Sequence, residues 1–521
     1  MNLTNEEILA IVKEKGILLE REIFDLMVNF SDGLKVRDFL TTIERVSGQK
    51  MITKSILNKN TFYVLEAIKH LQGNNKDSAE KVCVKLGISL EISKEKDPSE
   101  EPKKRRMDYQ IYYADTKATK KLEVADFKGH FRARYQQMQR ILMARPELNG
   151  LVAINKISST RQNLSIIGMV KDKRVTKNGN LILGVEDLTG EIKCLIKGDK
   201  REIFEIAEEL QMDDVIAIKA SGDRSILFVH DIFFPESHIP DKVHFSEDFS
   251  IAFLSDVHCG SNKHLKKGIN NFLEWLNMDE NAKKIRYIFF TGDNVDGVGI
   301  FPGQERVLEL KSMKEQYDLL ASYLERVPKH ITMFMCPGQH DAVRVAEPQP
   351  LIDRKYAESL YKIENLVMVT NPTLVKFLDK DKEFKVLMYH GASIHGFIQN
   401  IPKLRIMKAH KTPAKVVKCM LQRRHLAPTH SSVVYIPNID KDPLMIEQVP
   451  DVLCTGEVHR LDIDTHNGVL IITGSCWQAQ TDFEEKVGNI PDPCKVPVLN
   501  LKTRELKIYD FGDEEEINRE Y

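Results

Sequence analysis

The chain lacks any pair of cysteines in a C-x-x-C arrangement, and its eight cysteines are scattered over 521 residues. Cys194, Cys336 and Cys454 fall within short apolar runs, as is typical of buried thiols in a reducing compartment. A zinc ribbon and a disulfide framework are therefore not expected.

Long hydrophobic runs are also absent from the sequence. No apolar stretch approaches the roughly 20 residues that cross a bilayer. The first ten residues, MNLTNEEILA, have neither the basic start nor the apolar run of a secretory signal. We therefore expect a cytoplasmic protein that has no membrane partner.

An excess of charge of either sign is missing as well. With 75 basic and 76 acidic residues, the formal net charge is -1. The net charge of the chain therefore gives no overall attraction to a nucleic acid, and any contact with DNA has to come from a local basic surface.

The length of the chain predicts two or three domains. Residues 1–75 carry apolar side chains at helical spacing, which predicts a small helical module. Residues 76–145 predict a linker with dense charge of both signs, followed by bridging helices from about Tyr109 to Pro146. Residues 506–521 predict an acidic, frayed tail.

Residues 150–240 show the period-two alternation of strands and contain two hairpin signals, Asn178-Gly179 and Thr189-Gly190. The order of three strands, a helix and two strands predicts an OB-fold β-barrel, which commonly binds oligonucleotides. Few aromatic residues lie on its second and third strands, so a structural or subunit-contact role is favoured over base stacking.

Five apolar stretches run directly into residue types that bind metals. They are IAFLSDVH, YIFFTGDNVDG, ITMFMCPGQHD, VLMYHG and DVLCTGEVHR, all between residues 251 and 460. An Asp or His after a single buried strand is usually a turn former or a satisfied polar group. Five in succession favour a metal centre, because the carboxyl ends of strands in an α/β sheet converge.

The order of these motifs resembles the calcineurin-like metallophosphoesterase superfamily. The contexts P-G-Q-H-D-A-V-R (337–344), A-E-P-Q-P (346–350) and M-L-Q-R-R-H-L-A-P-T-H (420–430) resemble the exonuclease (small) subunits of archaeal family D DNA polymerases over roughly residues 150–510. The resemblance implies a multidomain α+β protein. Its OB-fold barrel would precede an α/β/β/α metallophosphoesterase sandwich over residues 245–505.

The resemblance also implies roles for individual residues. His340 would stabilise the transition state or protonate the leaving group, and Asp341 would orient its imidazole; a structural hydrogen bond is the alternative for Asp341. Asp293 would bridge two divalent ions. The other ligands are divided between a first ion (Asp256, His258, His459) and a second ion (Gln339, His390, Glu457).

Two of these positions depart from the superfamily pattern, and both belong to the second ion. Gln339 stands in place of Asn and offers the same amide oxygen on a longer stem. Glu457 stands in place of the first His of G-H-x-H and replaces a neutral nitrogen by an anionic oxygen. This change favours manganese, with magnesium as the alternative, over zinc. Full occupancy of the second ion and the strength of the nuclease activity are left open.

Basic residues are dense within 403–425, where Lys411, Arg423 and Arg424 are candidates for holding a phosphate backbone. A solvated amphipathic helix is the alternative for this segment. Arg344, just past G-Q-H-D, is a further candidate because its planar fork suits phosphate.

The leading functional hypothesis is a 3′→5′ exonuclease that proofreads single-stranded or mismatched DNA 3′ ends for a large catalytic polymerase subunit. The main alternative is a catalytically weak or inactive scaffold that supports the large subunit. A free-standing small-molecule phosphoesterase fits the metal motifs but leaves the N-terminal half without a role. A sliding clamp is left open as a partner.

Overall fold

The computed structural model describes residues 4–21, short pieces of the following segment (23–24, 36–37, 40–41, 44 and 50–53), and then 109–116, 121–236 and 241–518. The chain divides into two compact units, Met1–Arg105 and Arg106–Tyr521. Within the described ranges, no helix combines the length and the hydropathy needed to cross a membrane.

The first unit contains α1 (Asn5–Lys15), which is started by a capping box between Thr4 and Glu7 and ended by Gly16 at φ 62°. Two short strands, β1 (Leu18–Leu19) and β2 (Met51–Ile52), pair in parallel beside it. Apart from the short pieces named above, the rest of the predicted helical module and the charged linker as far as residue 108 lie outside the described residues.

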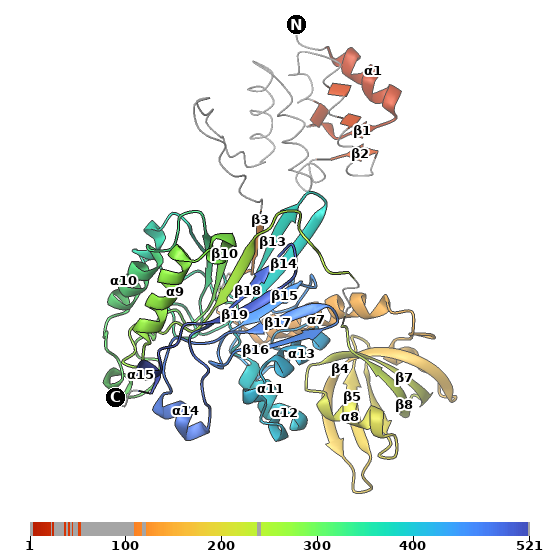
Figure 1. Ribbon diagram of the computed structural model, residues 1–521. Helices are drawn as coiled ribbons and strands as arrows, with labels where there is room; N and C mark the ends of the chain where they lie inside the picture. Colours follow the sequence, from red (N-terminus) through yellow and green to blue (C-terminus); the bar gives the residue numbers. More distant parts are fainter. Residues whose placement is uncertain are drawn as a thin grey trace. The chain divides into compact units, whose positions relative to one another are not determined.

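The second unit contains a closed five-stranded barrel in the order β4-β5-β6-β8-β7. Its core is aliphatic, and the predicted order of three strands, a helix and two strands is present (Figure 1). The elements are β4 (Gln162–Val175), β5 (Leu181–Glu186), β6 (Glu191–Ile196), α8 (Arg201–Glu209), β7 (Val215–Asp223) and β8 (Ile226–Phe233).

The unit also contains two six-stranded sheets, each of which combines parallel and antiparallel pairs. The first has the order β12-β11-β10-β9-β18-β19: β12 (Leu366–Met368), β11 (Thr332–Cys336), β10 (Ile285–Thr291), β9 (Ser250–Leu254), β18 (Lys495–Asn500) and β19 (Leu506–Asp510). The second has the order β16-β17-β15-β14-β13-β3: β16 (Asp462–His466), β17 (Val469–Thr473), β15 (Val452–Thr455), β14 (Lys382–Met388), β13 (Thr373–Asp379) and β3 (Tyr109–Tyr113).

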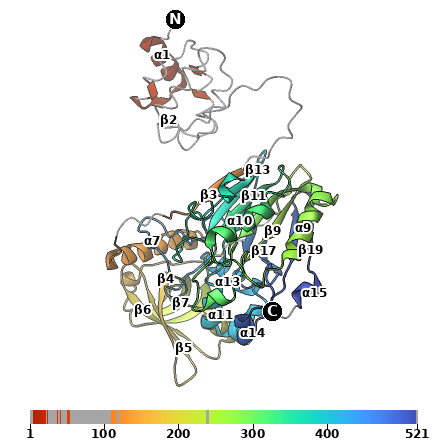
Figure 2. The same cartoon turned by 90° about the vertical axis from the view of Figure 1, so that its left-hand side faces the viewer.

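The inner faces of the two sheets share one aromatic-rich core, in which Phe289 and Phe334 of the first sheet pack with Phe377 of the second. Helices cover the outer faces (Figure 2). On the first sheet these are α9 (Lys266–Met278) and α10 (Met313–Leu324), and on the second they are α11 (Ile394–Asn400), α12 (Pro402–Ile406) and α13 (Ala414–Arg423). The strand ends of both sheets are thereby held in fixed positions.

Helix α7 (Val124–Met143) ties the barrel to the rest of the unit. Tyr135 donates to the carbonyl of Ile167 in β4 at 3.0 Å, and Arg134 donates to the carboxylate of Asp442 at 2.6 Å. Short elements complete the unit: α14 (Asp482–Val487), α15 (Glu514–Ile517), and the 3₁₀ turns Ile154–Lys156, Ala282–Lys284, Gln304–Arg306, Leu360–Lys362 and Ala409–Lys411.

Two segments differ from their predicted structure. Tyr109–Tyr113, expected to be helical, forms edge strand β3 because its backbone pairs with β13. The segment after residue 505, expected to be a frayed tail, forms β19 beside β18 and then α15. Glu516 accepts from the backbone N–H groups of Lys267 and Gly268 at the start of α9, so this acidic segment caps a helix.

Candidate metal centre

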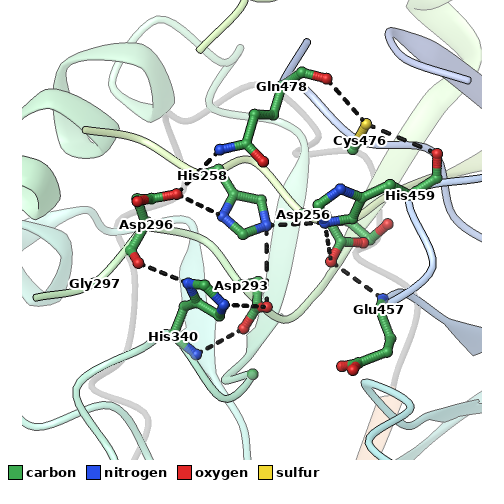
Figure 3. A network of polar contacts seen from close by, with 12 residues as sticks. Asp256, His258, Asp293, Asp296, Gly297, His340, Glu457, His459, Cys476 and Gln478 are labelled. Atoms are coloured by element: carbon green, nitrogen blue, oxygen red, sulfur yellow. Dashed lines mark hydrogen bonds and ion pairs between the residues drawn. The ribbon is translucent and has the colours of Figure 1, made fainter. Parts of the chain in front are cut away.

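The predicted ligands all follow strands of the two sheets. Figure 3 shows five of them close together: Asp256, His258, Asp293, Glu457 and His459. In the first sheet, Asp256 and His258 follow β9, and Asp293 follows β10. In the second, His390 follows β14 and Glu457 follows β15. Gln339 and His459 complete the set, after β11 and β15 respectively.

Five of these residues have a left-handed backbone, which L side chains rarely adopt: φ is 50° at Asp256, 49° at His258, 45° at Asp293, 76° at Glu457 and 58° at His459. Each such residue costs about 1–3 kcal/mol and persists only where its surroundings fix it. The loops are fixed by main-chain hydrogen bonds of 3.0 Å from the N–H of Asp256 to the carbonyl of Gly292, and from the N–H of His258 to the carbonyl of Asp293.

A first group of donor atoms consists of Asp256, His258 and His459. Nε2 of His258 lies 3.0 Å from Nε2 of His459, and the latter atom lies 3.6 Å from Oδ1 of Asp256. Nδ1 of His258 faces Asp296 at 3.1 Å, and Nδ1 of His459 faces Glu484 at 3.0 Å. An imidazole nitrogen that faces a carboxylate carries the proton, so in the neutral rings both Nε2 atoms direct lone pairs at the same point, which a shared proton or a metal ion can occupy. A cation between them removes this repulsion.

A second group consists of Asp293, His390 and Glu457, and Gln339 lies on the loop that follows β11. Nε2 of His390 lies 3.2 Å from Oδ2 of Asp293 and 3.2 Å from Oε2 of Glu457. Nδ1 of the same ring lies 2.9 Å from the carbonyl of Thr291, which fixes the proton there in the neutral imidazole. Nε2 thus directs a lone pair at two carboxylates, an arrangement that again requires a proton or a metal ion.

Two buried oxygen atoms at this centre have no hydrogen-bond partner, Oδ2 of Asp256 and Oε1 of Gln339. Buried polar atoms are nearly always satisfied, so two orphans beside the histidine groups fit a cation. The donor set of carboxylate, amide and imidazole atoms suits manganese, iron or zinc, and its oxygen-rich second group suits hard ions. The residues present therefore fit divalent metal ions.

The pKa values of the residues in both groups follow from burial and from nearby charges. Burial raises the pKa of Asp293 and Glu457, but the surrounding histidines outweigh it and hold both pKa values below their ordinary range. Burial lowers the pKa of His459, yet Glu484 and Asp256 outweigh it and raise that pKa to about 9. Burial raises the pKa of Asp256. Protons and metal ions therefore compete for the same atoms.

His340 lies beside both groups, and its side chain is 23% exposed. Its Nδ1 lies 2.7 Å from the carbonyl of Asp296, so Nε2 is turned toward the centre, 3.9 Å from Oδ2 of Asp293. Asp341 makes contacts other than the expected one with the imidazole of His340. Its carboxylate accepts from the backbone of Asn294 and Gly338 and from the hydroxyl of Tyr317, so the structure gives it a loop-stabilising role. The carbonyl of Asp296 holds the imidazole of His340 in place of Asp341.

Three residues that contact the ligands were not predicted from the sequence. Asp296 and Glu484 hold the outer nitrogens of His258 and His459, and His395 lies 3.3 Å from Oε1 of Glu457. Only Asp296 carried a signal, because it follows Asp293 by three residues in the same loop. Glu484 belongs to the capping box of α14, which concealed its second contact.

The four predicted DNA contacts have different environments. Arg423 is 2% exposed, donates to Asp214 at 3.0 Å and to the carbonyl of Glu209 at 2.6 Å, and so joins α13 to the barrel. Arg424 is also buried and donates to the carbonyl of Ile446 at 2.6 Å. Both are interior structural cations, which corrects their prediction as DNA contacts. Their burial depends on partners that are distant in the sequence.

Arg344 is half-buried, and its guanidinium donates to the carbonyls of Thr116, Ala346 and Pro348. Burial lowers its pKa. These contacts stabilise the loop after G-Q-H-D and occupy much of the fork that was expected to bind phosphate. Lys411 is exposed, as a phosphate contact requires.

Comparison with known proteins extends these observations. The family model for the B-subunits of DNA polymerases alpha and epsilon matches residues 251–461. A DNA polymerase II small subunit from Pyrococcus furiosus is 36% identical over 402 residues, which are 75% of this chain and 64% of the relative. The one from Methanothermobacter thermautotrophicus is 34% identical over 75% of this chain and 80% of its own length. The chain thus spans less than two thirds of the Pyrococcus furiosus relative.

Two solved structures share weaker likenesses with the chain. One is described as a novel archaeal phosphodiesterase, with 15% identity, a TM-score of 0.25 and coverage of 50% of this chain and 99% of that chain. The other is asparaginyl-tRNA synthetase from Pyrococcus horikoshii, with 14% identity, a TM-score of 0.15 and coverage of 17% of this chain and 22% of that one. At these TM-scores neither likeness carries an argument.

Proposed function

The chain belongs to the family of archaeal DNA polymerase II (family D) small subunits, and from this premise we propose that it is the subunit that removes nucleotides from DNA 3′ ends, as a metal-dependent 3′→5′ exonuclease. The observation that carries the proposal is the pair of imidazoles of His258 and His459, whose Nε2 atoms face each other at 3.0 Å. Such a pair serves metal binding and is difficult to explain by packing alone.

The first group (Asp256, His258, His459) and the second group (Asp293, His390, Glu457) would each hold one divalent ion. Gln339 would add a ligand to the second ion, and Asp293 would contribute to both ions. Ions bound in such a pair lower the pKa of water and stabilise the charge that develops on a phosphodiester. We propose manganese as the working ion, with magnesium as the alternative, because Gln339 and Glu457 contribute oxygen atoms where neutral nitrogen would favour zinc.

His340 is the residue of the chain itself that we propose to act on the substrate. The carbonyl of Asp296 fixes its Nδ1, and its Nε2 is left to face the centre from a partly exposed position. A proton held at Nε2 can pass to the oxygen that leaves when the terminal nucleotide is released. Removal of this imidazole would slow turnover and leave the ligand groups intact.

The remaining parts of the chain fit a polymerase subunit. We propose the barrel of β4–β8 and the adjoining sheets as the surface that binds the large catalytic subunit, and the exposed Lys411 as a contact for single-stranded or mismatched DNA. A sliding clamp is a further partner to test for the N-terminal unit, on family grounds alone.

Cleavage of a 3′-labelled, mismatched primer by the purified chain, alone and with its large subunit, tests the proposal. Release of mononucleotides that depends on manganese or magnesium is expected, and Asp293→Ala is expected to abolish it. His340→Ala is expected to retain bound metal and lose turnover. A wild-type protein that binds no metal ions and leaves the primer intact would favour a scaffold subunit instead.

A further inference from the structure

His395 lies at the rim of the centre and links the second group of ligands to a further histidine. It is the second residue of α11, and its Nε2 lies 3.3 Å from Oε1 of Glu457. Its Nδ1 lies 3.3 Å from Nε2 of His410, in the 3₁₀ turn Ala409–Lys411. The side chains of His410, His395 and Glu457 form a continuous row that ends at the carboxylate of Glu457.

The backbone that carries His395 is fixed to the loop that carries His390. The N–H of Ile394 donates to the carbonyl of Gly391 at 2.8 Å, and the hydroxyl of Ser393 donates to the carbonyl of Leu426 at 2.5 Å. The backbone position of His395 relative to the centre is therefore set by the fold.

The two oxygens of Glu457 are used differently. Oε2 lies 3.2 Å from Nε2 of His390, inside the second group, whereas Oε1 faces His395. A glutamate has three side-chain torsions, so a carboxylate held at one oxygen only can rotate away from an ion. A second contact at Oε1 removes this freedom and withdraws part of the negative charge that the carboxylate brings.

Exposure argues against a packing role for His395. Its side chain is 48% exposed, whereas that of Glu457 is 13% exposed. A half-exposed imidazole fills little of the interior, so its removal costs little packing energy. The contact with Glu457 is therefore the main consequence of its position.

We propose that His395, supported by His410, is a positioning residue that holds Glu457 in the coordination set of the second ion. The inference rests on the proposed metal centre and extends it. It assigns to His395 the role of fixing the carboxylate of Glu457, which stands where the superfamily usually has an imidazole. In this arrangement Nε2–H of His395 donates to Oε1, and Nε2–H of His410 donates to Nδ1 of His395.

Counting of bound manganese tests the inference, with the full-length chain titrated with Mn²⁺ and followed by electron paramagnetic resonance. His395→Phe keeps the ring and loses both nitrogens; it is expected to bind one ion as the wild type does and the other at least tenfold more weakly. His395→Gln keeps an N–H donor near the position of Nε2 and is expected to restore most of the affinity. His230→Phe, the same change on an exposed histidine of the barrel, is the matched control.

The outcomes separate the inference from the proposed function. Two ions bound equally tightly by wild type and His395→Phe would overturn the inference, as would a loss that His395→Gln does not relieve in protein of unchanged melting temperature. A wild type that binds fewer than two ions would overturn it too. Two ions without cleavage of DNA would reject the nuclease while leaving the positioning role of His395 in place.

Discussion

Nε2 of His258 and Nε2 of His459 lie 3.0 Å apart, while the opposite nitrogen of each ring is held by a carboxylate. The carboxylates of Asp296 and Glu484 fix the ring orientation and raise the basicity of the nitrogen that faces the centre. Both properties are those of histidines that bind metal ions.

Glu484→Gln tests the carboxylate behind His459. Glutamine retains the capping box of α14 with Thr481 but removes the anion beside Nδ1. The affinity of the first ion is expected to fall roughly tenfold with little change in stability. Isothermal titration of the metal-free protein with Mn²⁺ measures it. Thr481→Ala breaks the cap without changing the partner of His459, and it is expected to cost about 1 kcal/mol of stability with the ion affinity unchanged.

Glu457→His tests the origin of the metal preference. A neutral nitrogen in place of a carboxylate oxygen softens the second group, so the affinity for Zn²⁺ relative to Mn²⁺ is expected to rise by about tenfold or more. Competition between the two ions, read by mass spectrometry of the metal content after dialysis, gives the ratio. Gln339→Asn preserves the amide oxygen and serves as the comparison. An unchanged ratio in Glu457→His would show that Glu457 does not determine which ion is preferred.

Arg423 is predicted to contribute to stability and Lys411 to DNA binding. Arg423→Leu leaves Asp214 buried without its cation, so the free energy of unfolding is expected to fall by about 3–5 kcal/mol, with DNA affinity intact wherever the protein is folded. Urea denaturation measures the loss. Combining Arg423→Leu with Asp214→Leu removes both charges and should recover much of it.

Lys411→Ala is the complementary change. It is expected to weaken binding of single-stranded DNA and to lower the salt dependence of that binding by roughly one counterion, with no effect on unfolding. Fluorescence anisotropy at several salt concentrations provides both numbers. Equal DNA binding by Lys411→Ala and wild type would remove this lysine from the DNA surface.

The pH dependence of stability is expected to come partly from the cluster around Asp442. Burial lowers the pKa of His425 to about 4, and its Nε2 faces Asp442 at 2.8 Å. In the unfolded chain a histidine has a pKa of about 6.5. Between these values the unfolded chain binds a proton that the folded protein does not. The free energy of unfolding therefore decreases as pH falls from about 6.5 to 4, by on the order of 3 kcal/mol.

Urea denaturation at pH 7 and pH 4.5 checks the dependence on His425. His425→Gln keeps a donor toward Asp442 but does not titrate in this range, so its stability is expected to change less between the two pH values. Burial also lowers the pKa of His130, whose share of the effect should persist in the variant. An identical pH dependence in wild type and His425→Gln would contradict the assignment.

The strands and the Asp and His residues that follow them could be predicted because both signals are local. A buried strand followed by Asp or His occupies fewer than a dozen residues, and parallel strands bring such ends together without further information. The order of elements in the barrel was predictable for the same reason, since turn residues such as Asn178 and Gly179 mark its hairpins.

The rest depends on contacts between distant segments. Arg423 resembles a surface cation on a basic helix, and only Asp214, 209 residues earlier, makes it an interior one. Tyr109–Tyr113 becomes a strand because β13 offers an edge. The outer partners Glu484 and His395 belong to helices whose local patterns give no sign of a ligand. Tertiary structure, which single-sequence periodicity does not encode, decided each case.

The left-handed loops that carry Asp256 and His258 are held by main-chain hydrogen bonds to the neighbouring strand end. The main-chain hydrogen bonds of the protein, and not the metal ions, therefore offset the backbone strain of these loops. In small zinc domains, by contrast, chelation and unfolding are the same event. Here a chelator should remove the ions reversibly: the protein is expected to remain folded without metal and to regain its metal-dependent activity when metal is returned.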